Sequence, residues 1–306
     1  MTRYIFRRLL LTFPVIWGVV TLVFFLIHFI PGDPVEVMLG ETAQAVDKEH
    51  LRHELGLDKP IGGQYGDFLL RLVQGDWGQS LHSQEPVLGA IAGRIRPTVQ
   101  LAFCAVLVAL TIALPLGIAA AVKQDSLVDN LSMFLALLGI SLPHFWLGPL
   151  LIMLFALQFP WLPIGGYGGL THLILPAVTL GSAMSAILTR LIRSTMLEVL
   201  REDYIVTARA KGVRPVKVLC KHALKNALMP VITIVGLQLG ALLTGSIITE
   251  TIFSWPGIGR LIIQAINARD YPLVQGCVLV IALSYVLINL LTDLAYAYVD
   301  PRIRYT

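Results

Sequence analysis

The uncharged stretch PTVQLAFCAVLVALTIALPLGIAAAV, residues 97–122, decides the fold class. A helix needs about 20 predominantly apolar residues to cross the hydrocarbon core of a bilayer, and this stretch is longer than that. Three further stretches, residues 9–30, 226–249 and 271–292, are equally free of charged side chains. Because backbone groups in lipid must be bonded within their own helix, we expect each of the four to form one transmembrane helix.

A fifth uncharged region, residues 130–189, is long enough for two spans. Its middle reads FPWLPIGGYGGLT, residues 159–171. Proline and glycine interrupt helices there, and the tryptophan and tyrosine suit a membrane interface. The sequence therefore predicts six transmembrane helices.

The composition agrees with an all-α integral membrane protein. Of 306 residues, 56% are hydrophobic and 14% charged, and the mean hydropathy is +0.75. Soluble domains carry about 25% charged residues, so too few polar side chains remain to cover a soluble core. The three cysteines, Cys104, Cys220 and Cys277, are scattered and odd in number, which argues against a disulfide framework.

The distribution of basic residues predicts the orientation. The net charge of +4 and pI of about 9.0 come from charges beside apolar runs, so they indicate membrane topology rather than a nucleic-acid partner. With the N-terminus inside, fifteen Lys and Arg fall in inner segments, nine of them between residues 190 and 225, and eight fall outside. We expect the N-terminus and the C-terminus to be cytoplasmic, and the first span to be a retained anchor because no cleavage site follows it.

The chain divides into three expected regions. Residues 1–30 form an N-terminal transmembrane helix, and residues 31–96 form an extracytoplasmic loop region. A short helix is expected in that region over DKEHLRHEL, residues 47–55, with Gly56 as its stop. Residues 97–306 form a core of five transmembrane helices with a cytoplasmic loop at residues 194–228.

The patterns of common enzyme sites are absent from the sequence. There is no phosphate-binding G-x-x-x-x-G-K-[ST] loop, no G-x-S-x-G elbow and no metal-ligand cluster beyond the pair His50 and His53. We expect no catalytic residue and no metal site. Ion-coupled carriers keep ionisable groups near the bilayer midplane, whereas Glu250 and Asp293 stand at span ends and can reach the interfaces.

The inner loop has the pattern of a docking segment. A helix is expected over residues 196–209, after which Gly212 ends it and Pro215 starts another. Ala208, Ala210 and Gly212 are small, and small side chains permit close approach of another protein's surface.

At this point the sequence resembles a known family. The runs DYIVTARAKG at residues 203–212 and HALKNALMP at residues 222–230 are similar to the cytoplasmic loop of binding-protein-dependent ABC transporter permeases of the dipeptide, oligopeptide and nickel family. The resemblance spans nearly the whole chain. Its other motifs are FIPGDP (29–34), HELGLDKP (53–60), GDWGQS (75–80), ILPAVTLG (174–181), ETIFSWPGIGR (250–260), RDYP (269–272) and DPRIRY (300–305).

The resemblance implies a type I ABC importer permease in the bacterial inner membrane. In this family the inner loop forms a coupling helix that docks on a separate cytoplasmic ATPase, which holds the ATP and Mg²⁺, so no cofactor is expected on this chain. Carried over by position, the ATPase-contacting residues are Glu202, Asp203, Tyr204, Ala208, Ala210, Lys211 and Gly212. Val206 and Thr207 depart from the general consensus of Glu and Ala at these positions.

The resemblance also implies partners and a substrate class. The partners are a second related permease, two ATPase subunits, membrane lipid and an extracytoplasmic solute-binding protein facing residues 31–96 and 255–260. The substrates are di- or oligopeptides, with a nickel or metal chelate or glutathione as alternatives within the family. An ion-coupled secondary carrier and an intramembrane enzyme are alternatives from other classes.

Five residues within spans are candidates for the translocation path. GLQLG, residues 236–240, is a small-xxx-small pattern that suits either a narrow path or close packing against a neighbouring helix. The polar side chains of Gln238, Ser246 and Asn289 suit either a place on the path or a hydrogen bond to a neighbouring helix. The candidates are Gly236, Gln238, Gly240, Ser246 and Asn289.

Overall fold

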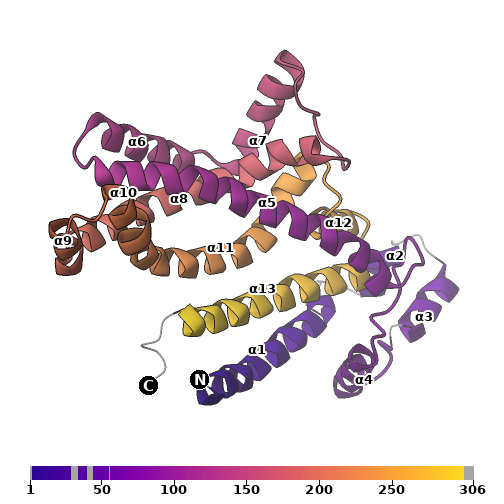
Figure 1. Cartoon of the computed structure of the whole chain (residues 1–306). Helices are drawn as coiled ribbons and strands as arrows, with labels where there is room; N and C mark the ends of the chain where they lie inside the picture. The colour runs from indigo at the N-terminus through magenta and orange to yellow at the C-terminus, as the bar shows by residue number, and fades with distance from the viewer. Residues whose placement is uncertain (1, 29–33, 40–43, 55, 300–306) are drawn as a thin grey trace.

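A computed structural model describes residues 2–28, 34–39, 44–54 and 56–299, and its regular elements are helices (Figure 1). Most of FIPGDP and all of DPRIRY lie outside these residues. In chain order the helices are α1 (Thr2–His28), α2 (Pro34–Leu39), α3 (Ala45–Glu54), α4 (Ile61–Val73), α5 (Val87–Val122), α6 (Leu127–Ser141), α7 (His144–Ile152), the π-helical η1 (Met153–Gln158), α8 (Leu170–Leu200), α9 (Asp203–Ala210), α10 (Pro215–Lys217), the π-helical η2 (Val218–Ala223), α11 (Leu224–Ile252), α12 (Ile258–Asn267) and α13 (Tyr271–Val299).

The main core lies between α5, α8 and α11. Helices α5 and α8 approach closely because glycines face their partner: a Cβ on Gly117 would lie 2.8 Å from Ile192, and one on Gly181 would lie 2.6 Å from the Ala105 carbonyl oxygen. Such small residues let membrane helices pack backbone to backbone.

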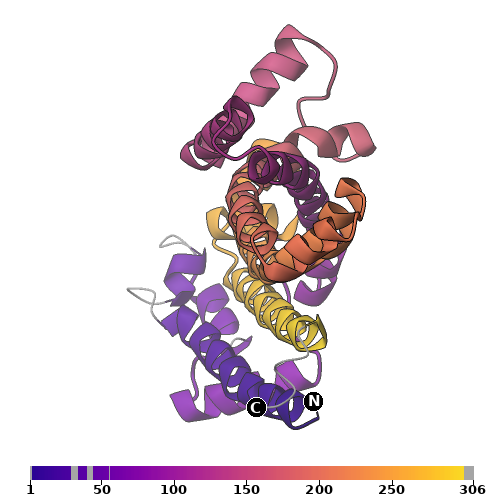
Figure 2. The same cartoon turned by 60° about the vertical axis from the view of Figure 1, so that its left-hand side comes forward.

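Helix α13 lies between this bundle and α1 (Figure 2). Val20 and Val23 of α1 and Leu279 of α13 are buried against each other. The N-terminal helix is therefore a peripheral element attached through α13.

Five helices in the described part of the chain are long and apolar enough to span a membrane, and a sixth span results if α6 and α7 with η1 count as one. That pair is bent by 101°. The predicted interruption at residues 159–171 is confirmed as the irregular link from η1 to α8. The bend at Leu142 was not predicted: Leu142 is extended (φ −87°, ψ 114°) because the following Pro143 disfavours helical backbone before it.

Two helix boundaries differ from expectation, and one is confirmed. Helix α5 begins at Val87, ten residues before the uncharged stretch, and carries Arg94 and Arg96 in its first part. The single helix expected over residues 196–209 is wrong, because extended backbone at Glu202 (φ −67°, ψ 144°) separates α8 from α9. The short helix ending before Gly56 is confirmed as α3 up to Glu54, and Gly56 has a positive φ of 66°.

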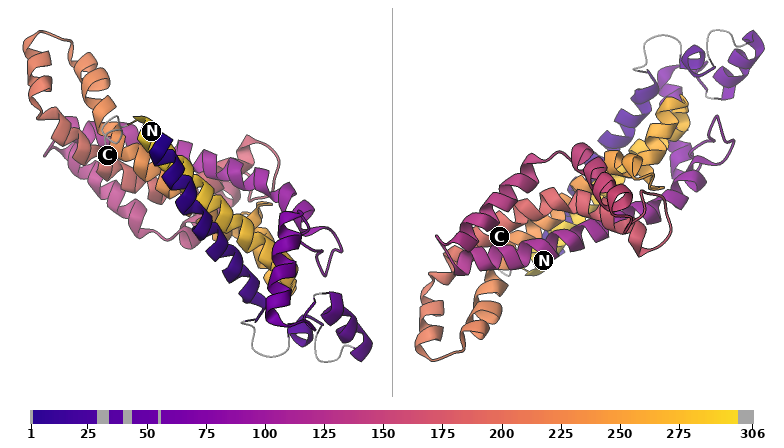
Figure 3. Two further views of the ribbon diagram at one scale, coloured as in Figure 1. Left: turned by 90° about the horizontal axis from the view of Figure 1, so that it is seen from below. Right: turned by 90° about the horizontal axis from the view of Figure 1, so that it is seen from above.

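The two ends of the bundle carry different elements. Helices α9 and α10 lie at one end, and α2, α3, α4 and α12 lie at the other (Figures 1 and 3). The first turns of α1 lie toward the α9 end. We call these the α9 end and the α12 end.

Candidate functional site

Helix α9 lies at the surface and is anchored to the core through one fully buried side chain. Ile205 is 0% exposed and belongs to the main core together with Met196 and Val218. Its neighbours Tyr204 and Val206 are 41% and 57% exposed. The helix therefore packs Ile205 fully inward, with Ala208 half-buried against the same core, and presents its other side chains outward.

The ends of α9 are fixed by backbone geometry. At its start, the Ile205 amide donates to the Glu202 carbonyl oxygen (2.9 Å), and Asp203 in the first turn suits the positive end of the helix dipole. At its end, the Gly212 amide donates to the Arg209 carbonyl oxygen (2.9 Å) and the Val213 amide to the Ala208 carbonyl oxygen (3.2 Å). This pair of bonds is a Schellman motif, which requires the positive φ of 72° at Gly212.

Side-chain bonds connect the α9 end to the transmembrane helices. Asn226 Nδ2 at the start of α11 donates to the Tyr204 hydroxyl (2.7 Å). Arg201 Nη2 at the end of α8 donates to Gln124 Oε1 in the link between α5 and α6 (3.3 Å). The first bond ties α9 to α11, and the second ties the end of α8 to the link between α5 and α6.

The structure brings the seven residues predicted for ATPase contact into one segment. Ala208 is half-buried, and the other six are exposed: Glu202, Asp203, Tyr204, Ala210, Lys211 and Gly212. Beside them, a cavity of about 500 Å³ is lined mainly by apolar residues, including Val122, Leu200, Val216 and Leu219. Val206 and Val216 are exposed apolar residues at this surface, with exposed fractions of 57% and 72%, and they were not among the predicted residues. The feature of the sequence that could have indicated them is an apolar side chain within a charged loop.

An ion pair that sequence reasoning missed lies near the same end. Arg193 of α8 donates from Nε and Nη2 to the two carboxylate oxygens of Asp129 in α6 (2.5 and 2.6 Å). Asp129 is buried, and it also accepts from the Asp125 amide (3.0 Å). Two parallel bonds of this kind fix orientation as well as distance, so α6 and α8 are joined rigidly.

Of the five candidates for the translocation path, the two glycines lie where α11 meets α13. A Cβ on Gly236 would overlap Thr292, and one on Gly240 would lie 2.9 Å from the Tyr285 ring. Gln238 is half-buried on α11. The Oδ1 atom of Asn289 on α13 is buried without a hydrogen-bond partner in the described part of the chain.

Ser246, the fifth candidate, belongs to a buried network around Glu250. The Glu250 carboxyl group is 0% exposed and accepts from Thr98 Oγ1 (2.8 Å), Ser246 Oγ (3.1 Å) and the Arg260 amide (3.0 Å). The expectation that Glu250 can reach an interface is therefore wrong, because α5 and α12 close over it.

Tight packing around Glu250 explains much of the ETIFSWPGIGR motif. Trp255 is buried and donates from Nε1 to the Pro97 carbonyl oxygen (2.9 Å). A Cβ on Gly257 would overlap the Glu250 carboxyl group. We call Thr98, Ser246, Glu250, Trp255 and Gly257 the Glu250 cluster.

Asp293, the other acidic residue at a span end, is partly exposed. It pairs with Arg8 of α1 (2.6 Å), which ties α13 to the N-terminal helix. Among the residues that the structure describes, no three His, Cys, Asp or Glu side chains gather in a way that suits a metal ion.

Comparison with known families agrees with this architecture. Residues 113–305 match the family described as "Binding-protein-dependent transport system inner membrane component". Residues 1–102 match the family described as "Binding-prot-dependent transport system membrane comp, N-term". The chain belongs to this family of binding-protein-dependent transport components. The resemblance inferred from the sequence motifs is confirmed.

Curated relatives are similar over their whole length. The dipeptide transport system permease protein DppB of Alkalihalophilus pseudofirmus is 45% identical, with 100% of each chain covered. The glutathione transport system permease protein GsiC of Pectobacterium atrosepticum is also 45% identical over 100% of each chain. DppB of Escherichia coli K12 is 43% identical over 100% of this chain and 99% of that one.

Solved structures show the same fold. A chain of the MetNI methionine ABC transporter, in an inward-facing conformation, matches with a TM-score of 0.57 at 18% identity over 71% of this chain and 99% of its own. An amino acid ABC transporter solved with histidines matches with a TM-score of 0.52 at 17% identity over 70% and 94% of the two chains. The predicted all-helical ABC importer fold is confirmed.

The family defines the general activity. The chain is a permease subunit of a binding-protein-dependent ABC importer, and it is a multi-pass protein of the bacterial inner membrane. Such an importer includes ATPase subunits and a binding protein. The permease is not itself catalytic, and the family implies no cofactor on this chain.

Proposed function

We propose that this permease imports short peptides delivered by a solute-binding protein. The observation that carries the proposal is the equal, full-length similarity to permeases named for dipeptides and for glutathione. Glutathione is itself a tripeptide, so both names fall within one substrate class. A nickel or metal chelate is the alternative substrate within the family.

We propose that the exposed segment from Glu202 to Gly212 is the coupling helix that docks on the ATPase. Its support is geometric: Ile205 is the one fully buried side chain of α9, most of the other side chains are exposed, and an apolar cavity lies beside the helix. The chain has no phosphate-binding loop, so the energy for transport has to enter through such a contact.

The proposed orientation places the α9 end in the cytoplasm and the α12 end outside. The start of α1 lies toward the α9 end, which agrees with a cytoplasmic N-terminus (Figure 3). The proposed assembly contains a second related permease and two ATPase subunits, and the solute-binding protein faces the α12 end. The same proposal includes three regions: an N-terminal transmembrane helix that ends at residue 30, an extracytoplasmic region that ends at residue 96, and a cytoplasmic loop at residues 194–228.

We further propose that Gly236, Gln238, Gly240, Ser246 and Asn289 lie beside the substrate path. The unpartnered Oδ1 of Asn289 supports this, because a buried acceptor without a donor suits a site that a polar solute visits. The two glycines bring α11 and α13 together at the same level and so shape that side of the path.

The test is uptake by the assembled transporter. The tagged chain is captured with its partners in mild detergent, reconstituted into liposomes and supplied with binding protein and ATP. We expect ATP-dependent uptake of labelled dipeptide or glutathione, with little uptake of nickel. Uptake of nickel chelate alone would contradict the substrate class. Uptake driven by a proton gradient without ATP would contradict the proposed coupling.

A further inference from the structure

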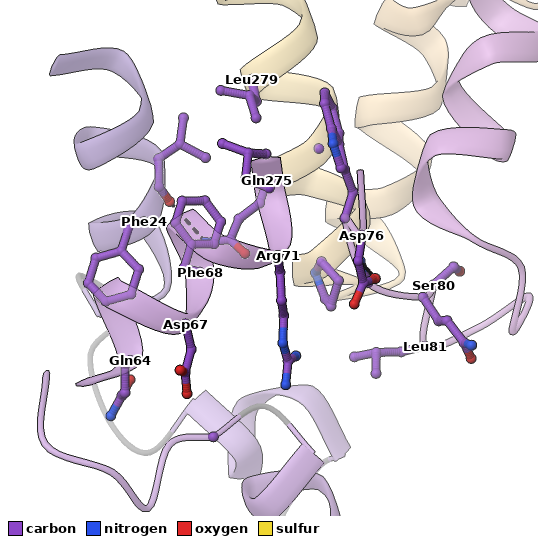
Figure 4. A pocket seen from close by; sticks show the side chains of 18 of the residues that line it. Phe24, Gln64, Asp67, Phe68, Arg71, Asp76, Ser80, Leu81, Gln275 and Leu279 are labelled. Carbon is purple, nitrogen blue, oxygen red and sulfur yellow. Dashed lines mark hydrogen bonds between the residues drawn. The ribbon is translucent and has the colours of Figure 1, made fainter. Parts of the chain in front are cut away.

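A second cavity lies at the α12 end, away from α9. It measures about 430 Å³, opens to the surface and is bordered by the last turns of α1, by α4, by residues 76–84 and by the start of α13 (Figure 4). Small-molecule sites typically occupy about 300–1,000 Å³. The cavity lies on the α1 side of α13, whereas Gly236 and Gly240 contact α13 from α11.

The walls of the cavity are fixed by hydrogen bonds between helices. Gln275 Nε2 of α13 donates to the Val23 carbonyl oxygen of α1 (2.9 Å). His28 Nε2 of α1 lies 3.1 Å from Gln64 Oε1 of α4. The site is thus formed before any ligand enters, and a preformed site avoids the free-energy cost of ordering its walls on binding.

One part of the lining is apolar and aromatic. Phe24 and Phe68 pack with their ring centroids 5.6 Å apart, and Trp77, Leu81 and Leu279 complete this surface. Such a surface accommodates an aliphatic or aromatic side chain.

The charged part of the lining contains Arg71, an exposed cation that pairs with no acidic group among the described residues. Lys59 pairs with Asp67 (2.5 Å) and, with a smaller contribution from Arg71, holds the pKa of Asp67 below its usual range. In the described part of the chain Arg71 makes no ion pair within 4 Å. Its side chain extends between those of Asp67 and Asp76 in the view of Figure 4.

Asp76 supplies the opposite charge. One of its carboxylate oxygens accepts from the Gly78 amide (3.1 Å), and no described cation pairs with it. Arg71 and Asp76 therefore offer one receptor for a carboxylate and one for an ammonium group, next to an apolar surface.

We propose that this cavity binds a small zwitterion, an amino acid or short peptide with both termini free and an apolar side chain. Arg71 holds the carboxylate, Asp76 holds the ammonium group, and the side chain lies against Phe24, Phe68 and Trp77. The ligand contacts α1, α4 and the segment that follows α4 together, so its binding stabilises the packing of α1 against α4. The cavity lies at the α12 end, which the proposed orientation places outside the cell, and only this assignment of side rests on the proposed function. The binding chemistry does not rest on it.

The test is calorimetric titration of the purified full chain with leucylalanine, its C-terminal amide and its N-acetyl form. We expect the wild type to bind the free dipeptide. Each blocked form should bind with an affinity lower by about 10-fold or more, which is the loss typical of one charge-assisted contact. Arg71→Gln should lose the discrimination against the amide. The matched control Arg96→Gln, at an exposed arginine outside the cavity, should keep it.

Two results would overturn the proposal: no binding of leucylalanine to the wild type, or equal binding of the free and amidated dipeptides. The second comparison uses the wild type alone, so it stands even where Arg71→Gln fails to fold. ATP-dependent uptake by the reconstituted complex is measured separately, so a failure of the proposed transport function is distinguished from a failure of this site.

Discussion

The α9 end and the α12 end satisfy their polar groups in different ways. At the α9 end, an eight-residue helix has one fully buried side chain, Ile205, and exposes most of its other polar and apolar groups. At the α12 end, the Glu250 carboxyl group and the Trp255 indole are buried and bonded to groups of the same chain.

This difference separates two kinds of sequence motif. The ETIFSWPGIGR motif resembles the family as clearly as the α9 motif does. Its Glu, Trp and central Gly residues, however, pack against one another and against α5. It builds the end of the bundle. The α9 motif leaves most of its side chains exposed, which is the property expected of a surface that a partner covers.

The largest expected effect is at the Glu250 cluster. Glu250→Ala removes the acceptor for Thr98, Ser246 and the Arg260 amide and leaves these donors buried. Unsatisfied buried donors cost roughly 1–3 kcal/mol each, so we expect a loss of about 4 kcal/mol. Thermal unfolding of the detergent-solubilised chain measures it.

The matched control for this variant is Glu85→Ala, at an exposed glutamate of the same end. We expect its melting temperature to stay close to that of the wild type. Equal melting temperatures for the Glu250 and Glu85 variants would show that the buried network does not hold the α12 end together.

A smaller and local effect is expected from Ile205→Ala. Truncating a buried isoleucine costs roughly 3 kcal/mol, and here the loss falls on the attachment of α9 rather than on the transmembrane bundle. Hydrogen exchange should therefore rise in residues 203–210 with little change in α5 and α8. Exchange that rises equally across the bundle would contradict the role of Ile205 as the main anchor of α9.

The smallest effect is expected from Gly212→Ala. A Cβ there meets nothing within 4 Å, so only the positive φ is penalised, by about 1 kcal/mol. Gly89→Ala is the matched control, because Gly89 is also uncrowded but lies within α5, where alanine favours the helix. Melting temperatures that shift in opposite directions support the account, whereas equal shifts would contradict it.

The local features of the fold were predictable from the sequence. The apolar stretches indicate the spans, and the positive φ at Gly56 and Gly212 follows from the helix-stop role expected of those glycines. The bend at Leu142 also has a local cause in Pro143, but the apolar run across it conceals the break.

The long-range features were not predictable. Glu250 meets Thr98, 152 residues earlier in the chain, and Arg193 meets Asp129, 64 residues earlier. Neither pairing has a local sequence signal, because each depends on which helices become neighbours. The inward position of Ile205 likewise depends on the turn at Glu202, where the chain contains neither proline nor glycine.

The most direct test of the central claim is the accessibility of α9 before and after assembly. A cysteine replaces Val206, which is 57% exposed, in a Cys220→Ser background that removes the exposed native thiol. Maleimide labelling is then timed for the lone permease and for its complex with the ATPase subunits, with Glu85→Cys at the opposite end as the control. The account predicts fast labelling at residue 206 in the lone chain, strong protection in the complex and no change at residue 85. Equal labelling at residue 206 in both states would contradict it.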